Sequence, residues 1–269
     1  MLRKISIYSL ILMMSLVMVL GVSCKKNERQ PSSETYDFGI DINDVSGKWQ
    51  MGYVLRLNSG LYTMDEDTGN DTDLIKWQAS LNLGDSIMTG ETRKATYDKT
   101  VYDVIEVRTN TGREGFALAT QIAVGGNLAV VVDEKANLFR TPNAIDVTGS
   151  IISRRTVLVY YPETESNGLV EIRAYDPEAR ANRHGNFVKF SSLSTRTSDI
   201  QSSILLQAAL PLRVEVAAEK NRREALLETA LLDYSDSVFF SEIFEIANPA
   251  PIVNETVDYE EEDSMSLDQ

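Results

Sequence analysis

The chain has 269 residues, a net charge of −14 at neutral pH, and one cysteine and one histidine. An acidic surface repels phosphate backbones, which argues against nucleic acid as a partner. With Cys24 as the sole cysteine and His184 as the sole histidine, the chain cannot form an intramolecular disulfide, a thiolate metal cluster or a zinc site with several histidine ligands.

Residues 1–23 predict a signal peptide. A basic start precedes an apolar run over residues 5–20, which is short for a membrane-spanning helix, the competing interpretation. The small residues that lead into Cys24 resemble the bacterial lipobox, although Gly21 stands where that motif usually has leucine. The resemblance implies that Cys24 carries a lipid, so we expect a protein anchored to a membrane of the bacterial cell envelope.

Residues 24–48 are expected to form a flexible tether, because residues 25–35 are polar and lack aliphatic side chains. From Trp49 onward, short β-branched and aromatic runs are separated by Gly, Asn and Asp, which predicts β-strands joined by turns. The alternation is clearest over residues 101–108 and is typical of a half-buried strand.

The order of these segments then repeats. Val131 follows Val54 at a spacing of 77 positions, each within an apolar run, and we interpret the pattern as an internal duplication. The other matched segments are residues 104–108 with 169–173, which share a Glu and an Arg, and residues 115–122 with 186–193.

The repeated segments resemble bacterial SH3-like (SH3b) domains. In the first copy, residues 83–87 are similar to the opening of the hairpin, residues 102–108 to the central strand, and residues 112–116 to the closing motif, with Phe116 for the usual tryptophan. The resemblance implies a mainly β protein with two small SH3-like β-barrels in tandem, over residues 49–125 and 126–195. It also implies a peptide, cell-wall or protein ligand, because such domains bind cell-wall peptides or act as spacers and docking modules.

A helical period replaces the strand pattern after residue 195, and residues 196–249 predict an α-helical C-terminal extension. We expect a first helix with a capping-box-like start at Ser198, a second over residues 214–232, and a last helix capped by Asp236. The acidic tail, residues 250–269, is predicted to be disordered.

An acidic stretch in the first copy is a candidate calcium site. Its alternating carboxylates could supply oxygen ligands, but Lys76 stands where an EF-hand loop needs glutamate. We therefore favour a solvated acidic loop and expect no cofactor, with calcium as the open alternative. The carboxylates concerned are Asp65, Asp67, Asp71 and Asp73.

Aromatic side chains of the first copy are the candidate ligand groove, although they could equally fill the interior of a barrel. We predict a binding or scaffolding lipoprotein. The contrasting function is an envelope hydrolase that acts on phospholipid or peptidoglycan through two carboxylates, or through His184 with Ser191 or Ser192; the spacing selects no such pair. The groove candidates are Tyr53, Tyr62, Trp77 and Tyr102.

Overall fold

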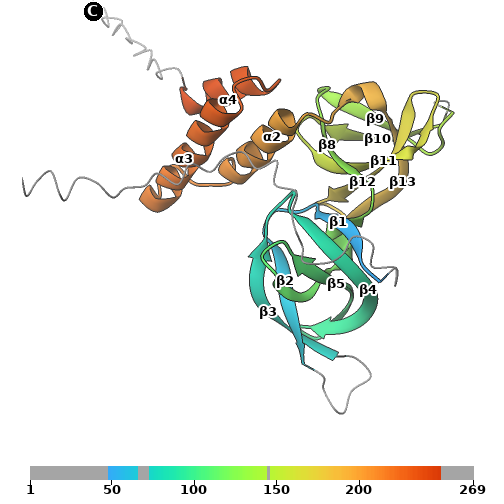
Figure 1. Ribbon diagram of the computed structural model, residues 1–269. Helices are drawn as coiled ribbons and strands as arrows, with labels where there is room; N and C mark the ends of the chain where they lie inside the picture. The colour runs from blue at the N-terminus through green and yellow to red at the C-terminus, as the bar shows by residue number, and fades with distance from the viewer. Residues whose placement is uncertain (1–47, 66–72, 144–145, 250–269) are drawn as a thin grey trace, which may run out of the picture. The chain divides into compact units, whose positions relative to one another are not determined.

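The computed structural model describes residues 48–65, 73–143 and 146–249. These residues form two seven-stranded sheets followed by three helices (Figure 1). The prediction of a mainly β protein with a helical C-terminal extension is confirmed at this level. The predicted signal peptide, Cys24, residues 24–47 of the tether and the tail from residue 250 lie outside the described residues. Within the described part, no helix is long and apolar enough to span a membrane.

The first sheet has the strand order β3-β2-β6-β5-β4-β1-β7. Neighbouring strands are antiparallel, and a short parallel pairing, Asp73 with Ala95 and Leu74 with Thr96, also joins β3 to β4. Alternate side chains point inward and form one core cluster that includes Val54, Leu61 and Ile105. The strands are β1 (Gln50–Val54), β2 (Ser59–Asp65), β3 (Asp73–Leu81), β4 (Ser86–Tyr97), β5 (Thr100–Thr109), β6 (Glu114–Leu118) and β7 (Ile122–Val124).

The second sheet has the order β10-β9-β13-β12-β11-β8-β14, which is the order of the first sheet with every strand number raised by seven. Its core includes Val131, Leu138 and Ile172. The strands are β8 (Asn127–Val131), β9 (Lys135–Phe139), β10 (Val147–Ser153), β11 (Val157–Ser166), β12 (Leu169–Asp176), β13 (Ala181–Lys189) and β14 (Leu193–Ser194).

Matched segments of the sequence occupy matching places in the two sheets. Tyr62 of β2 pairs with Phe116 of β6, and Phe139 of β9 pairs with Phe187 of β13. A single 3-10 turn then leads into the last strand of each sheet, η1 (Ala119–Gln121) before β7 and η2 (Phe190–Ser192) before β14. The shared strand order therefore extends to residue pairing and to the closing turn.

The three helices are α2 (Thr197–Ala209), α3 (Ala217–Asp233) and α4 (Phe240–Ala247). The predicted capping roles of Ser198 and Asp236 are wrong, because neither helix has a side-chain cap and α4 begins only at Phe240. Instead, the Ser198 hydroxyl donates to the Asp236 carboxylate at 3.2 Å, and Arg196 also binds that carboxylate. Ser198 and Asp236 therefore bind each other across the chain and do not accept hydrogen bonds from the backbone N–H groups at the start of a helix.

One apolar cluster joins the helices to both sheets. Leu83 comes from the turn between β3 and β4, and Val130 and Val157 come from β8 and β11. Phe239 and Ile243, both fully buried, fill the helical side of the cluster. The two sheets also meet directly, because the Tyr161 hydroxyl donates to the Val124 carbonyl oxygen at 3.1 Å. The remaining buried members are Ile200, Leu206, Ala209, Leu227 and Ala230.

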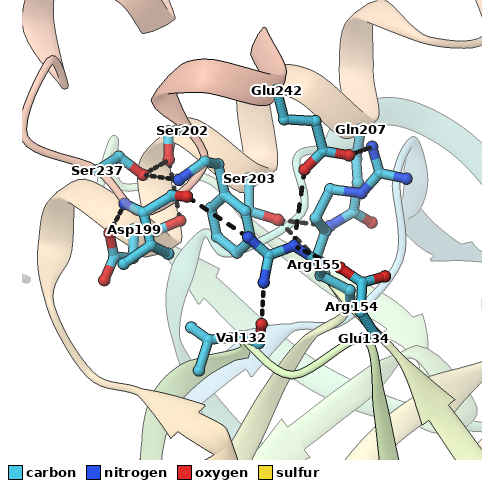
Figure 2. A network of polar contacts seen from close by, with 12 residues as sticks. Val132, Glu134, Arg154, Arg155, Asp199, Ser202, Ser203, Gln207, Ser237 and Glu242 are labelled. Carbon is cyan, nitrogen blue, oxygen red and sulfur yellow. Dashed lines mark hydrogen bonds and ion pairs between the residues drawn. The ribbon is translucent and has the colours of Figure 1, made fainter.

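A polar network surrounds the junction between the helices and the second sheet (Figure 2). Arg155 pairs with Glu242 of α4 at 2.8 Å, and its carbonyl oxygen accepts hydrogen bonds from Ser203 and Gln207 of α2 at 2.6 and 2.7 Å. The neighbouring Arg154 lies over the ring of Phe239 at 4.8 Å. Ser203 and Gln207 thus find a partner across the junction, whereas Oε2 of Glu242 is buried without a hydrogen-bond partner within the described residues.

The turn before β4 offers a pH-dependent test of the fold. Burial raises the pKa of the Asp85 carboxyl, although its Oδ2 accepts the Asn82 N–H at 2.8 Å. The pKa of the folded state lies above that of the unfolded state, so this group favours folding most at low pH and loses that contribution as the pH rises through the two values. Asp85→Asn is therefore expected to gain stability relative to the wild type as the pH rises from about 3 to about 6. Urea unfolding across this range checks it, and parallel profiles would contradict it.

Candidate functional site

A groove of about 460 Å³ lies on the first sheet, and we call it the Trp49 groove. It runs from Trp49, which precedes β1, over Glu106 and Arg108 of β5. It then passes Phe116 of β6 and reaches Met64 of β2. The groove therefore combines aromatic and apolar surface with charged side chains, the usual composition of a ligand site.

Strand alternation explains the charged part of the groove. Ile105 and Val107 are buried in the core of the first sheet, whereas Glu106 and Arg108 are half-buried. Successive side chains of a strand point to opposite faces, so the Glu and the Arg share the face away from the core. The sequence pattern of β5 thus places a carboxylate and a guanidinium side by side.

Opposite charges in the groove are paired. The Glu106 carboxylate lies 2.7 Å from Arg93 and 3.7 Å from Lys48, while Arg108 lies 2.5 Å from Glu114. The Arg108 guanidinium also lies 4.9 Å from the centre of the Trp49 ring, within the range of a cation–π contact. These contacts hold both β5 side chains in fixed positions.

Two polar atoms in the groove are nevertheless buried without a hydrogen-bond partner within the described residues. They are Oε2 of Glu106, an acceptor, and Nε of Arg108, a donor. Lys48 is too far from Oε2, at 3.7 Å, for a hydrogen bond. Such groups cost free energy in a folded protein and call for an explanation.

The aromatic residues expected to form a ligand groove lie elsewhere. Tyr62 is buried in a cluster against which Tyr102 packs, and Tyr53 packs against a separate cluster between the two sheets. Burial raises the pKa of the Tyr53 and Tyr62 hydroxyls. Trp77 of β3 is 60% exposed. None of these four residues lines the Trp49 groove as the described part of the chain forms it.

Two of the four aspartates of the candidate calcium site are among the described residues. Asp65 forms an ion pair with Lys76, and Asp73 begins β3. Asp67 and Asp71 lie outside the described residues. Within those residues, no group of three or more His, Cys, Asp or Glu side chains is arranged to hold a metal ion. Calcium binding stays a prediction.

The histidine and serines of the hydrolase alternative lie at the end of the second sheet. His184 belongs to β13, and its side chain is outside the description. In η2, which follows β13, Ser191 is exposed and Ser192 is buried. The structure therefore gives no geometry for a Ser–His pair.

The second sheet has counterparts for the charged residues of the groove but not for Trp49. Glu171 and Arg173 of β12 match Glu106 and Arg108, whereas Gly126 occupies the position 77 residues after Trp49. A side chain there would be strained, because Gly126 has a φ of +67° and a Cβ would lie 2.6 Å from the Tyr160 carbonyl oxygen. The difference between the copies is therefore the signal in the sequence that could have identified the groove.

No protein-family model matches the chain, and a comparison with curated proteins also found no match.

Proposed function

We propose that this protein is a lipoprotein of the bacterial cell envelope, anchored through Cys24, that binds a peptide or protein segment with two SH3-like domains. The observation that carries the proposal is the Trp49 groove, an open surface where an aromatic ring and a paired carboxylate and guanidinium meet. Aromatic residues and arginine are the side chains that most often dominate binding energy at protein interfaces.

The fold supports the binding role in two ways. The strand order of the first sheet is repeated in the second, as expected for tandem SH3-like domains. The helices share an apolar cluster with both sheets, which holds the first sheet, through Leu83, to the rest of the fold. Lipid attachment at Cys24 would hold this binding surface at the membrane.

Peptide selection tests the proposal. The full chain in lipid nanodiscs is exposed to a phage-displayed library of random dodecapeptides, and enriched sequences are synthesised. Trp49→Ala is expected to weaken their binding about tenfold or more, because it removes the central aromatic surface. Trp77→Ala is the matched control, since Trp77 is exposed and lies outside the groove. If no peptide is enriched, or if both variants bind equally well, the proposal is wrong.

The same preparation distinguishes a binder from a hydrolase. Incubation with phospholipid vesicles and with purified peptidoglycan is expected to release no product while peptide binding saturates. Product release that a single carboxylate substitution or His184→Ala abolishes would instead establish the hydrolase.

A further inference from the structure

Glu106 Oε2 is buried between two neighbours. A Cβ placed on Gly90 would lie 2.7 Å from this oxygen and 3.3 Å from the ring of Trp49, so the three groups converge on one small space. Arg108, two residues along β5, has the same Trp49 ring over its guanidinium. Trp49 therefore covers the carboxylate and the guanidinium together.

The covered atoms complement one peptide group. Oε2 of Glu106 needs a hydrogen-bond donor, and Nε of Arg108 needs an acceptor. An ammonium group would satisfy only the first atom, and a carboxylate only the second. A peptide has both an N–H and a C=O, and an extended peptide repeats them along one edge every two residues, as the side chains of β5 repeat.

We propose that Trp49 is a movable cover, and that Glu106 and Arg108 beneath it are the pair that recognises the main chain of an extended peptide ligand. Movement of the Trp49 ring opens both atoms, and the displaced ring then packs against the ligand, so Trp49 still contributes aromatic surface to binding. The ligand then donates a main-chain N–H to Glu106 and accepts a hydrogen bond from Arg108. This inference rests on the proposed function and adds to it the residues and the chemical group that are recognised.

A comparison with the second sheet shows why we place the recognition site beneath Trp49. Glu171 and Arg173 repeat the charged pair, but neither has a buried side-chain atom without a partner in the described part of the chain. Gly126 gives that pair no counterpart of Trp49, and the Tyr161 side chain lies beside Arg173 instead. We therefore place recognition in the first sheet alone, and the second pair supplies a control.

An ester scan tests the recognition pair. In the tightest peptide from the selection, each amide is replaced in turn by an ester, which removes one N–H and keeps the chain length. One ester is expected to weaken binding about tenfold or more. Glu106→Gln is expected to weaken the parent peptide and to make that same ester harmless, because the acceptor for the lost N–H is already altered.

Two further measurements separate this role from a structural one. Glu171→Gln, the matched control, is expected to leave the affinities for the parent peptide and for the ester unchanged. In a Trp77→Phe background, where Trp49 is the sole tryptophan, peptide binding is expected to shift the tryptophan emission. Urea unfolding of each variant confirms that it is folded before binding is compared.

The outcomes distinguish this inference from the proposed function. Main-chain recognition would be overturned if no single ester weakened peptide binding, or if Glu106→Gln and Glu171→Gln changed the peptide affinity equally. Either result would leave the proposed binding function standing. Unchanged tryptophan emission on binding would overturn the moving cover. Failure to enrich any peptide, or competition by glycan strands alone, would remove the proposed function and this inference with it.

Discussion

Phe239→Ala is expected to lower the free energy of unfolding by about 3–5 kcal/mol, the usual range for a fully buried phenylalanine. Phe239 has no exposed surface and lies in the apolar cluster that joins the helices to the sheets. Truncation removes the ring from this cluster and also removes the surface on which the Arg154 guanidinium lies. Both losses act on the same junction, so we expect a value within this range rather than below it.

Urea unfolding measures the effect, and Phe244→Ala is the matched control. Phe244 is in α4 but is 53% exposed, so its truncation is expected to cost less than about 1 kcal/mol. Similar losses for the two variants would show that the helices are not held to the sheets through Phe239. A change in the denaturant slope would show that the helices separate before the sheets unfold.

Asp199→Ala is expected to lower the free energy of unfolding by about 3 kcal/mol. The carboxylate is buried, and it accepts the Val238 N–H at 2.8 Å and the Ser194 hydroxyl at 2.5 Å. Its position beside Ser202 and Ser237 is visible in Figure 2. Alanine leaves the two donors without their partner at a position where the carboxylate itself is buried, and the cost of the unpaired donors dominates the result.

Two variants control for this interpretation. Asp199→Asn retains an acceptor oxygen and is expected to lose less stability than Asp199→Ala. Asp236→Ala removes an exposed carboxylate that pairs with Arg196, and surface ion pairs contribute at most about 1 kcal/mol. Equal losses for Asp199→Ala and Asp236→Ala would contradict the importance of burial.

Local periodicity was a sound guide to the strands. The alternation over residues 101–108 predicted β5, and the spacing between Val54 and Val131 matches the ends of β1 and β8. Each pattern depends on neighbours within one strand or one repeat, which is the information that a sequence displays directly.

Helix starts were less predictable, because their partners are distant in the chain. Ser198 has the sequence context of a capping residue, but Asp236 lies within reach of its hydroxyl in the folded protein. A motif of four residues cannot show that a carboxylate 38 positions away competes for the same side chain.

The residues that line the Trp49 groove could not be selected from the sequence, for a related reason. Tyr62 and Trp77 are conspicuous in the sequence, but one is buried and the other is on an exposed strand outside the groove. The significance of Trp49 depends on the small size of Gly90 beneath it and on the bare Gly126 in the second copy. Only the fold brings the first of these into contact with Trp49, and only a comparison of the copies reveals the second.

The apolar cluster shared by Leu83, Val130 and Phe239 also has a consequence for amide exchange. Segments that share one core open together, so their slowest amides share a common free energy of opening. The slow amides of α2, of β8 and of the turn at Leu83 should therefore report a single opening event. A division of the chain at residue 195 marks a change of sequence pattern, but it separates residues that protect one another from solvent.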